Sequence, residues 1–202
     1  EIKEKYKDIL IYIDIDKNIF NKDLKELEHI LLEVEKLNIS GIMFYDLSVI
    51  NLKNKLNLKT NIIWAPNFLV TNYKTIEFYN TLGVSKAVIS SCITKEDTKE
   101  ILKRDKEQFI HIFGYQLMAF SKRKLVTNYF KEINEDVKYR YIKKEGNKYR
   151  ICENNSGTFI LSDKVLNAMK YLNEFKTYNP NLILNEIEIS HNKFLKIIKI
   201  YK

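Results

Sequence analysis

Residues 9–45 read ILIYIDIDKNIFNKDLKELEHILLEVEKLNISGIMFY, and this stretch decides the fold. Residues 9–13 form a continuous apolar run, which is typical of a strand covered on both faces. Residues 23–37 carry apolar side chains at helical spacing, with Asn21 or Asp23 as the N-cap. A second apolar run at 41–45 completes a strand–helix–strand unit. Such a unit predicts two parallel strands joined by a right-handed crossover.

The same unit recurs along the first two-thirds of the chain. Further strands are predicted at 61–64, 86–90 and 108–113. The helices between them are predicted at 47–56, at 71–82 before Gly83, and from Thr94 to Lys103. The fold class that follows is α/β, with partial TIM-barrel-like parallel (β/α) units.

The pattern changes after about residue 131. Residues 137–144 and 148–152 predict a hairpin around Glu145-Gly146-Asn147, and 158–161 a third strand. A helix at 163–175, a strand at 182–189 and a last helix at 191–201 are expected to follow. We therefore expect a barrel-like domain at 1–131 and a small antiparallel β-rich region with a C-terminal helix at 132–202.

Composition limits the class of protein. The chain has 202 residues, 45% of them hydrophobic, and a net charge of +8. This charge would attract phosphate backbones or acidic partners, although an AT-rich genome gives the same lysine excess. No apolar run reaches the ~20 residues of a membrane span, and no signal peptide is visible, so no membrane partner is expected.

The cysteines and histidines predict neither disulfides nor metal. Cys92 and Cys152 lie far apart without a CxxC motif, which favours a reduced, cytoplasmic protein. Together with three scattered histidines they make no convincing zinc site, so no metal is expected. The histidines are His29, His111 and His191.

Polar residues follow the predicted parallel strands, where α/β folds collect ligands. They are Asp14, Asp16, Tyr45, Asp46, Trp64 to Asn67, Ser90 to Cys92, and Phe113 to Gln116. The alternative is structural: Asp46 and Thr94 would cap helices, and Trp64 would pack the barrel mouth. Ser90, Ser91 and Cys92 suggest a nucleophile, but the sequence names no base for it. His111 is not assigned as this base, because it lies inside a predicted strand. The catalytic residues therefore stay unassigned.

The second basic feature is the segment 121–150. It contains Lys122 and Arg123, and the hairpin alternation predicts one face with Lys138, Arg140, Lys148 and Arg150. The other face would carry Val137, Tyr139, Tyr141, Tyr149 and Ile151. A basic face backed by aromatic rings could hold RNA. The alternative is an ordinary half-buried sheet with a solvated outer side.

Short motifs along nearly the whole chain make it resemble the collagenase-like peptidase U32 family. They are Asp14, Asn18 to Asn21, Asp23-Leu24, residues 41–46, Thr71-Asn72, Phe78-Tyr79, Leu82 to Val84, Phe113 to Tyr115, Met118 to Ser121, Leu125, Asn128 to Phe130, Ser156 to Thr158, Leu161-Ser162 and Tyr201. The resemblance implies a TIM-barrel-like domain and a small β-rich region. It also implies a peptidase of unassigned catalytic type, or a part in tRNA or ribosomal RNA hydroxylation or in ubiquinone synthesis.

Two departures from the family pattern limit these implications. The family's signature strand typically ends in His-Gly and is followed by two cysteines, and here these places hold Phe113-Gly114, Leu117 and Lys124. Leu and Lys cannot ligate iron, so no iron–sulfur cofactor is expected and the chain resembles a cysteine-free variant or a decayed paralogue. A strand–helix–strand stretch before residue 9 is also missing. Another chain, a missing N-terminal segment or the C-terminal region would then cover the open edge.

Three functions follow as hypotheses. The first is a U32-type peptidase, whose substrate contacts would be Asp46, Trp64, Asn67, Asn72, Ser121, Arg123 and Asn128. The second is an RNA-binding or RNA-modification accessory protein without a cluster, using Lys122, Arg123, Lys138 and Arg140. The third is an assembly role, in which the incomplete barrel docks a partner or a second copy.

Overall fold

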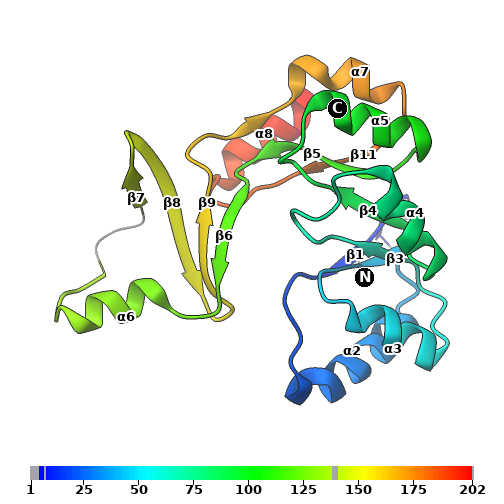
Figure 1. Cartoon of the computed structure of the whole chain (residues 1–202), viewed down its shortest axis with the longest axis horizontal. Helices are drawn as coiled ribbons and strands as arrows, with labels where there is room; N and C mark the ends of the chain where they lie inside the picture. Colours follow the sequence, from blue (N-terminus) through cyan, green and yellow to red (C-terminus); the bar gives the residue numbers. More distant parts are fainter. Residues whose placement is uncertain (1–4, 7, 138–140, 202) are drawn as a thin grey trace. The chain divides into compact units, whose positions relative to one another are not determined.

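The computed structural model describes residues 5–6, 8–137 and 141–201, and the chain divides into two compact units (Figure 1). Unit 1 comprises residues 1–110 and 178–181, and unit 2 comprises residues 111–177 and 182–202. Each unit is described by itself. No helix among the described residues has the length and apolar content needed to cross a membrane.

Unit 1 is built from parallel strands and the helices between them. The strand order is β1 (Tyr12–Ile15), β2 (Gly41–Phe44), β3 (Ile62–Trp64), β4 (Lys86–Ile89) and the start of β5 (Phe109–Gly114). The connecting helices are η1 (Asn21–Asp23), α2 (Leu24–Lys36), α3 (Ser48–Leu56), α4 (Tyr73–Thr81) and α5 (Lys95–Arg104). The predicted α/β architecture with parallel (β/α) units is confirmed. β1 ends this strand order, and what covers its outer edge stays a prediction.

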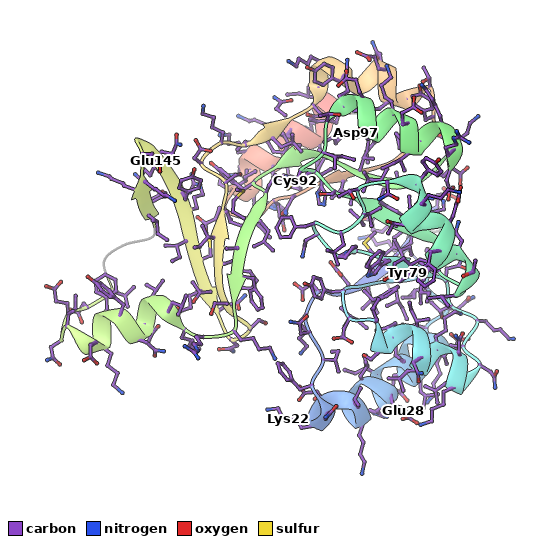
Figure 2. All side chains as sticks on the ribbon, viewed as in Figure 1. Lys22, Glu28, Tyr79, Cys92, Asp97 and Glu145 are labelled. Carbon is purple, nitrogen blue, oxygen red and sulfur yellow. The ribbon has the colours of Figure 1, made fainter. Side chains whose placement is uncertain are left out.

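One face of the parallel sheet packs against these helices. Its side chains come from alternate positions of β2, β3 and β4, and Ile42, Phe44 and Ile62 are at most 1% exposed. The indole of Trp64 lies on this face, 3.8 Å from the ring of Tyr79 on α4, a residue labelled in Figure 2. This face therefore forms the main core of unit 1.

The other face of the sheet is concave. Tyr12 on β1 and Phe109 on β5 have ring centroids 5.7 Å apart, although three strands lie between them. Flat strands at ~4.8 Å spacing would separate these two positions by about 19 Å, so the sheet must curl toward this face. Position 41 on this face leaves no room for a side chain, because an added Cβ would lie 2.7 Å from Ile63 and 3.1 Å from Tyr12.

Unit 2 contains a four-stranded antiparallel sheet. Its order is β6 (Leu117–Ser121), β9 (Gly157–Leu161), β8 (Asn147–Asn154) and β7 (Tyr141–Lys144), and α6 (Leu125–Glu132) lies beside it in Figure 1. The remaining elements are β10 (Leu166–Asn167), η2 (Met169–Tyr171), α7 (Leu172–Lys176), β11 (Asn181–Leu184) and α8 (His191–Tyr201). The predicted small antiparallel sheet and C-terminal helix are confirmed.

Two element predictions in this region were wrong. The predicted helix at 163–175 begins instead with β10, because Leu166 and Asn167 pair antiparallel with Gly114 and Phe113 of β5. Only its end is helical, as η2 and α7. The predicted strand at 182–189 stops at Leu184, since the chain then turns and Glu188 adopts a positive φ of 60°.

The hairpin of β7 and β8 has a different register from the predicted one. Glu145 and Gly146 alone form the turn, with φ values of 51° and 80°, and Lys144 pairs with Asn147. Two positive φ values are the mark of a type I′ turn, which needs only two residues. The predicted turn had one residue more, and a shift of one residue exchanges the faces of a strand. Tyr141 consequently lies opposite Arg150, on the same face.

A hydrogen-bonded cluster joins α6 to the sheet. The Glu153 carboxylate accepts hydrogen bonds from the backbone N–H groups of Val126 and Thr127, at 2.9 Å and 3.3 Å. The buried Thr158 hydroxyl lies 2.8 Å from Glu153 and accepts from the Leu125 N–H at 2.9 Å. Burial alone would raise the pKa of Glu153, but these hydrogen bonds hold it below its ordinary value. The start of α6 is thereby fixed to the face that carries Glu153 and Thr158.

Gly157 should be indispensable for this arrangement. Its φ is +139°, and an added Cβ would lie 2.1 Å from the Ser121 carbonyl oxygen. Gly157→Ala should therefore lower the free energy of unfolding by about 3 kcal/mol or more. Gly146→Ala is the matched control, because its φ of +80° is also positive but nothing lies within 4 Å. It should lose only about 1 kcal/mol. Equal losses in urea denaturation would contradict the steric explanation.

Candidate functional site

The predicted contacts in unit 1 have mainly structural surroundings. The Asp46 carboxylate accepts from the N–H groups of Ile19 and Ser48, at 3.0 Å and 2.9 Å. Burial would raise its pKa, but these hydrogen bonds hold the pKa of Asp46 below its ordinary value. Asn72 caps α4, accepting from the Thr75 N–H at 3.0 Å. Asn72 is thus the N-cap of α4, whereas Asp46 lies just before Leu47, the N-cap of α3, and satisfies the first N–H group of that helix.

Trp64 and Asn67 differ in their availability. Trp64 is 3% exposed and packed between the sheet and α4, so its ring is not presented to a ligand. Asn67 is half-buried in the loop after β3 and has a φ of 60°, a conformation that Asn tolerates better than most residues. Of the predicted contacts in unit 1, Asn67 alone keeps no cap or core position in the part of the chain described.

Among the described carboxyl groups of unit 1, Asp14 has the largest pKa shift. Its pairing with Met43 and its alternation with Tyr12 place it on the concave face of the sheet. The side chain remains exposed, yet the surrounding face desolvates it, and Asp16 adds a like charge. The two effects raise the pKa of Asp14 from 3.8 to about 6. A carboxyl that titrates there can both give and take protons near neutral pH.

The Ser90–Cys92 segment holds no assembled nucleophile. The Ser90 hydroxyl is 2% exposed and accepts from the Cys92 N–H at 3.2 Å, which is a local turn contact. Cys92 is exposed in the loop that follows β4 (Figure 2). His111 belongs to unit 2, where burial lowers its pKa and favours the neutral ring. Among the described residues, no three His, Cys, Asp or Glu side chains gather as a metal site would require.

The predicted residues of unit 2 lie around the connection from β6 to α6. The Ser121 hydroxyl accepts from the Arg123 N–H at 3.2 Å, and the Arg123 carbonyl lies 2.7 Å from the Thr158 hydroxyl. The Arg123 side chain, Lys122 and Asn128 are exposed. Lys138 and Arg140, the other two residues predicted to contact RNA, fall outside the described residues. Of the three contacts that the peptidase hypothesis places here, Ser121 and Arg123 belong to one turn and Asn128 lies on α6.

The face of the antiparallel sheet opposite Glu153 and Thr158 was not foreseen. We call it the cation–aromatic face and define it by Phe120, Phe159, Tyr141, Lys143, Lys148 and Arg150, which the strand registers place on one side. Phe120 and Phe159 have ring centroids 5.0 Å apart. Tyr141 and Phe120 are 39% and 38% exposed. The face therefore offers accessible aromatic surface together with positive charge.

Cations lie against the aromatic rings of this face. Lys148 Nζ is 3.9 Å from the centroid of the Tyr141 ring. The Arg150 guanidinium lies 4.5 Å from the Tyr115 ring and 5.5 Å from the Tyr141 ring. Burial would lower the pKa of Arg150, but Tyr115, Tyr141 and Glu188 raise it above its ordinary value, so this side chain stays charged. Such cation–π pairs hold flat groups in a fixed orientation.

The signal that could have found this face is the Glu145-Gly146 pair. A Gly as the second turn residue favours a two-residue turn, and counting outward from it pairs Tyr141 with Arg150. The contribution of Tyr115 has no comparable signal, because it depends on how the β5–β6 connection folds.

One comparison with known proteins identifies the family of this chain. Peptidase family U32 matches residues 3–202 of the chain, so the chain belongs to this family. A tRNA hydroxylation protein P2 of Bacillus subtilis is 23% identical over 163 residues, 75% of this chain and 53% of that protein. An uncharacterized protease of Methanocaldococcus jannaschii is 29% identical over 127 residues, 59% of this chain and 30% of that protein. No solved structure matches the chain significantly.

The match leaves two finer expectations unconfirmed. The chain spans about half the length of the first relative and less than a third of the second. Whether strands precede β1 is not tested by this. The description as a cysteine-free variant is not confirmed either, because the chain contains Cys92 and Cys152.

The raised pKa of Asp14 predicts a pH-dependent effect on stability. The folded protein holds the Asp14 proton more tightly than the unfolded chain, so this stabilising term is present below pH 3.8 and lost as the pH rises through about 6. Asp14→Asn should therefore stabilise the fold above this window by about 1 kcal/mol or less, since the carboxyl is exposed. It should change little below it. Urea denaturation at both ends of the window tests this, and a pH-independent effect would contradict it.

Proposed function

We propose that this member of peptidase family U32 binds RNA through the cation–aromatic face and acts in RNA modification. The observation that carries the proposal is the placement of Tyr141, Lys148 and Arg150 on one face, with both cations against a tyrosine ring. RNA bases stack on aromatic and guanidinium planes, and lysines neutralise the phosphates between them.

The accessible rings favour an unpaired stretch of RNA over a duplex. Stacking on Tyr141 or Phe120 needs a base that is free of its own neighbours, as in loops, bulges and ends. The net charge of +8 adds a long-range attraction for the RNA backbone. The similarity to a protein named for tRNA hydroxylation supports the same class of substrate.

One lysine pair on the β7–β8 hairpin gives a sharp test. Lys148 belongs to the cation–aromatic face, whereas Lys144 lies on the opposite side of the same hairpin. Lys148→Glu should weaken binding of a labelled single-stranded RNA by about tenfold at low salt. It should also reduce the dependence of log K on log salt by about 0.7, the value for one lost phosphate contact on a single strand. Lys144→Glu should have a much smaller effect.

Fluorescence anisotropy over a salt series measures both quantities. The two variants carry the same net charge, so a difference between them reports the face rather than the overall attraction. Absence of RNA binding to the wild-type chain at low salt would refute the proposed function. Equal weakening by both substitutions would refute the assignment to this face.

Hydrolysis is the second candidate, and Asp14 favours it. A carboxyl with a pKa of about 6 next to a second acid, Asp16, resembles the carboxyl pairs that share acid and base roles in catalysis. Asn67, on the loop after β3, remains the candidate substrate contact from unit 1. In this hypothesis the catalytic carboxyl groups would lie on the concave face of unit 1.

If the chain hydrolyses peptides, Asp14→Asn should abolish the activity, because an amide cannot exchange a proton near neutral pH. Asp136→Asn is the control, since it makes the same substitution on an exposed segment after α6. Gelatin and a mixed peptide pool, each with and without divalent metal ions, serve as substrates. Cleavage that survives Asp14→Asn, or no cleavage by the wild-type chain, would exclude this hypothesis.

A further inference from the structure

Arg150 of unit 2 forms an ion pair with the carboxylate of Glu188. Its Nη1 donates to the Glu188 carboxylate at 3.3 Å and to the Tyr141 hydroxyl at 3.4 Å. Tyr115 and Tyr141 lie on the guanidinium at 4.5 Å and 5.5 Å. The side chains of Arg150 and Glu188 are 25% and 30% exposed, so the pair is open to solvent. Arg150 is thus oriented by two rings and neutralised by one carboxylate.

Glu188 reaches this position from a tight turn after β11. The turn is closed by the Ile187 N–H on the Asn185 side chain at 2.9 Å and by the Ile189 N–H on the Glu186 carbonyl at 2.9 Å. Glu188 itself has a φ of 60°, a conformation that disfavours a residue with a side chain. The strained backbone of Glu188 places its carboxylate on Arg150. This indicates that the contact has a role besides closing the turn.

The ion pair is weak enough to exchange. Solvent-exposed pairs of this kind contribute little to stability, because water screens them and both side chains must be ordered. A guanidinium fork matches a phosphate as well as it matches a carboxylate, and a phosphate carries the larger charge. A phosphate at Arg150 would therefore compete with the Glu188 carboxylate for the same guanidinium.

We infer that Arg150 is a phosphate-binding site for RNA and that Glu188 occupies this site as an internal competitor until RNA displaces it. The inference depends on the proposed function and adds the residue that recognises the backbone. Tyr141, which lies on Arg150 and is 39% exposed, is then beside the bound phosphate, where the adjoining base can stack. The competitor favours RNA over small anions, because only a ligand that also gains stacking replaces Glu188 effectively.

Glu188→Gln tests the inference directly, because it removes the competing charge and leaves Arg150 in place. We expect this variant to bind a fluorescein-labelled oligouridine about two- to fivefold more tightly than the wild-type chain, the range that corresponds to an exposed ion pair. Glu186→Gln is the matched control, because it also removes one negative charge from the same turn. Glu186 contributes only its backbone carbonyl to the described contacts. It should change the affinity less than Glu188→Gln.

Arg150→Gln should weaken binding about tenfold, and Arg150→Lys should restore only part of the loss because lysine has no planar fork. Circular dichroism would show that these variants are folded. If Glu188→Gln and Glu186→Gln tighten binding equally, general charge explains the gain and the inference is wrong. If Lys148→Glu weakens binding while Arg150→Gln does not weaken it and Glu188→Gln does not tighten it, the inference fails but the proposed function stands. If the wild-type chain and Glu188→Gln both fail to bind RNA, the proposed function and the inference are both wrong.

Discussion

The two positive φ values at Glu145 and Gly146 constrain most of what distinguishes unit 2. A two-residue turn with this geometry allows one register, and that register places Tyr141 opposite Arg150. With a turn one residue longer, Tyr141 would move to the side of the sheet that carries Glu153. The chemistry of the exposed face thus depends on a local backbone preference, and Gly146 can satisfy its part without steric strain.

A second constraint acts on the other side of the same sheet. Gly157 lets β9 pass close to the Ser121 carbonyl, and this approach brings Thr158 and Glu153 to the first N–H groups of α6. An acidic group at the start of a helix satisfies donors that have no partner within the helix and also interacts favourably with the helix dipole. The Ser156-Gly157-Thr158 motif is therefore explained by packing. The cation–aromatic face lies on the opposite side of the sheet.

The sequence was informative where periodicity decides the outcome. The apolar runs and helical stripes of residues 9–113 identified the parallel strands and helices, because burial on one or both faces controls those patterns. β6 and α6 were not predicted, and the helix proposed at 163–175 was in part a strand, since short elements there are held by pairing with β5 and by the Glu153 cluster. Contacts between distant residues leave little trace in local spacing.

The site was less predictable than the fold for the same reason. Asp46 and Asn72 were correctly placed in loops after strands, but the structure uses their oxygen atoms to cap backbone N–H groups. Trp64 faces the helices because the strand alternation places it beside Phe44 on the buried side. The raised pKa of Asp14 depends on the curl of the sheet, and the Arg150 cluster depends on Tyr115 and Glu188, which are distant in sequence.

The position of β7 at the end of the four-strand order has one more consequence. Its outer side carries unpaired backbone donors and acceptors among the described strands, a geometry that invites another β-strand to add on. Lys143 and Lys144 place positive charge on both sides of this edge, and repulsion between two such edges opposes fibre-like self-association. Apolar replacements of these lysines would therefore be expected to promote aggregation through this edge.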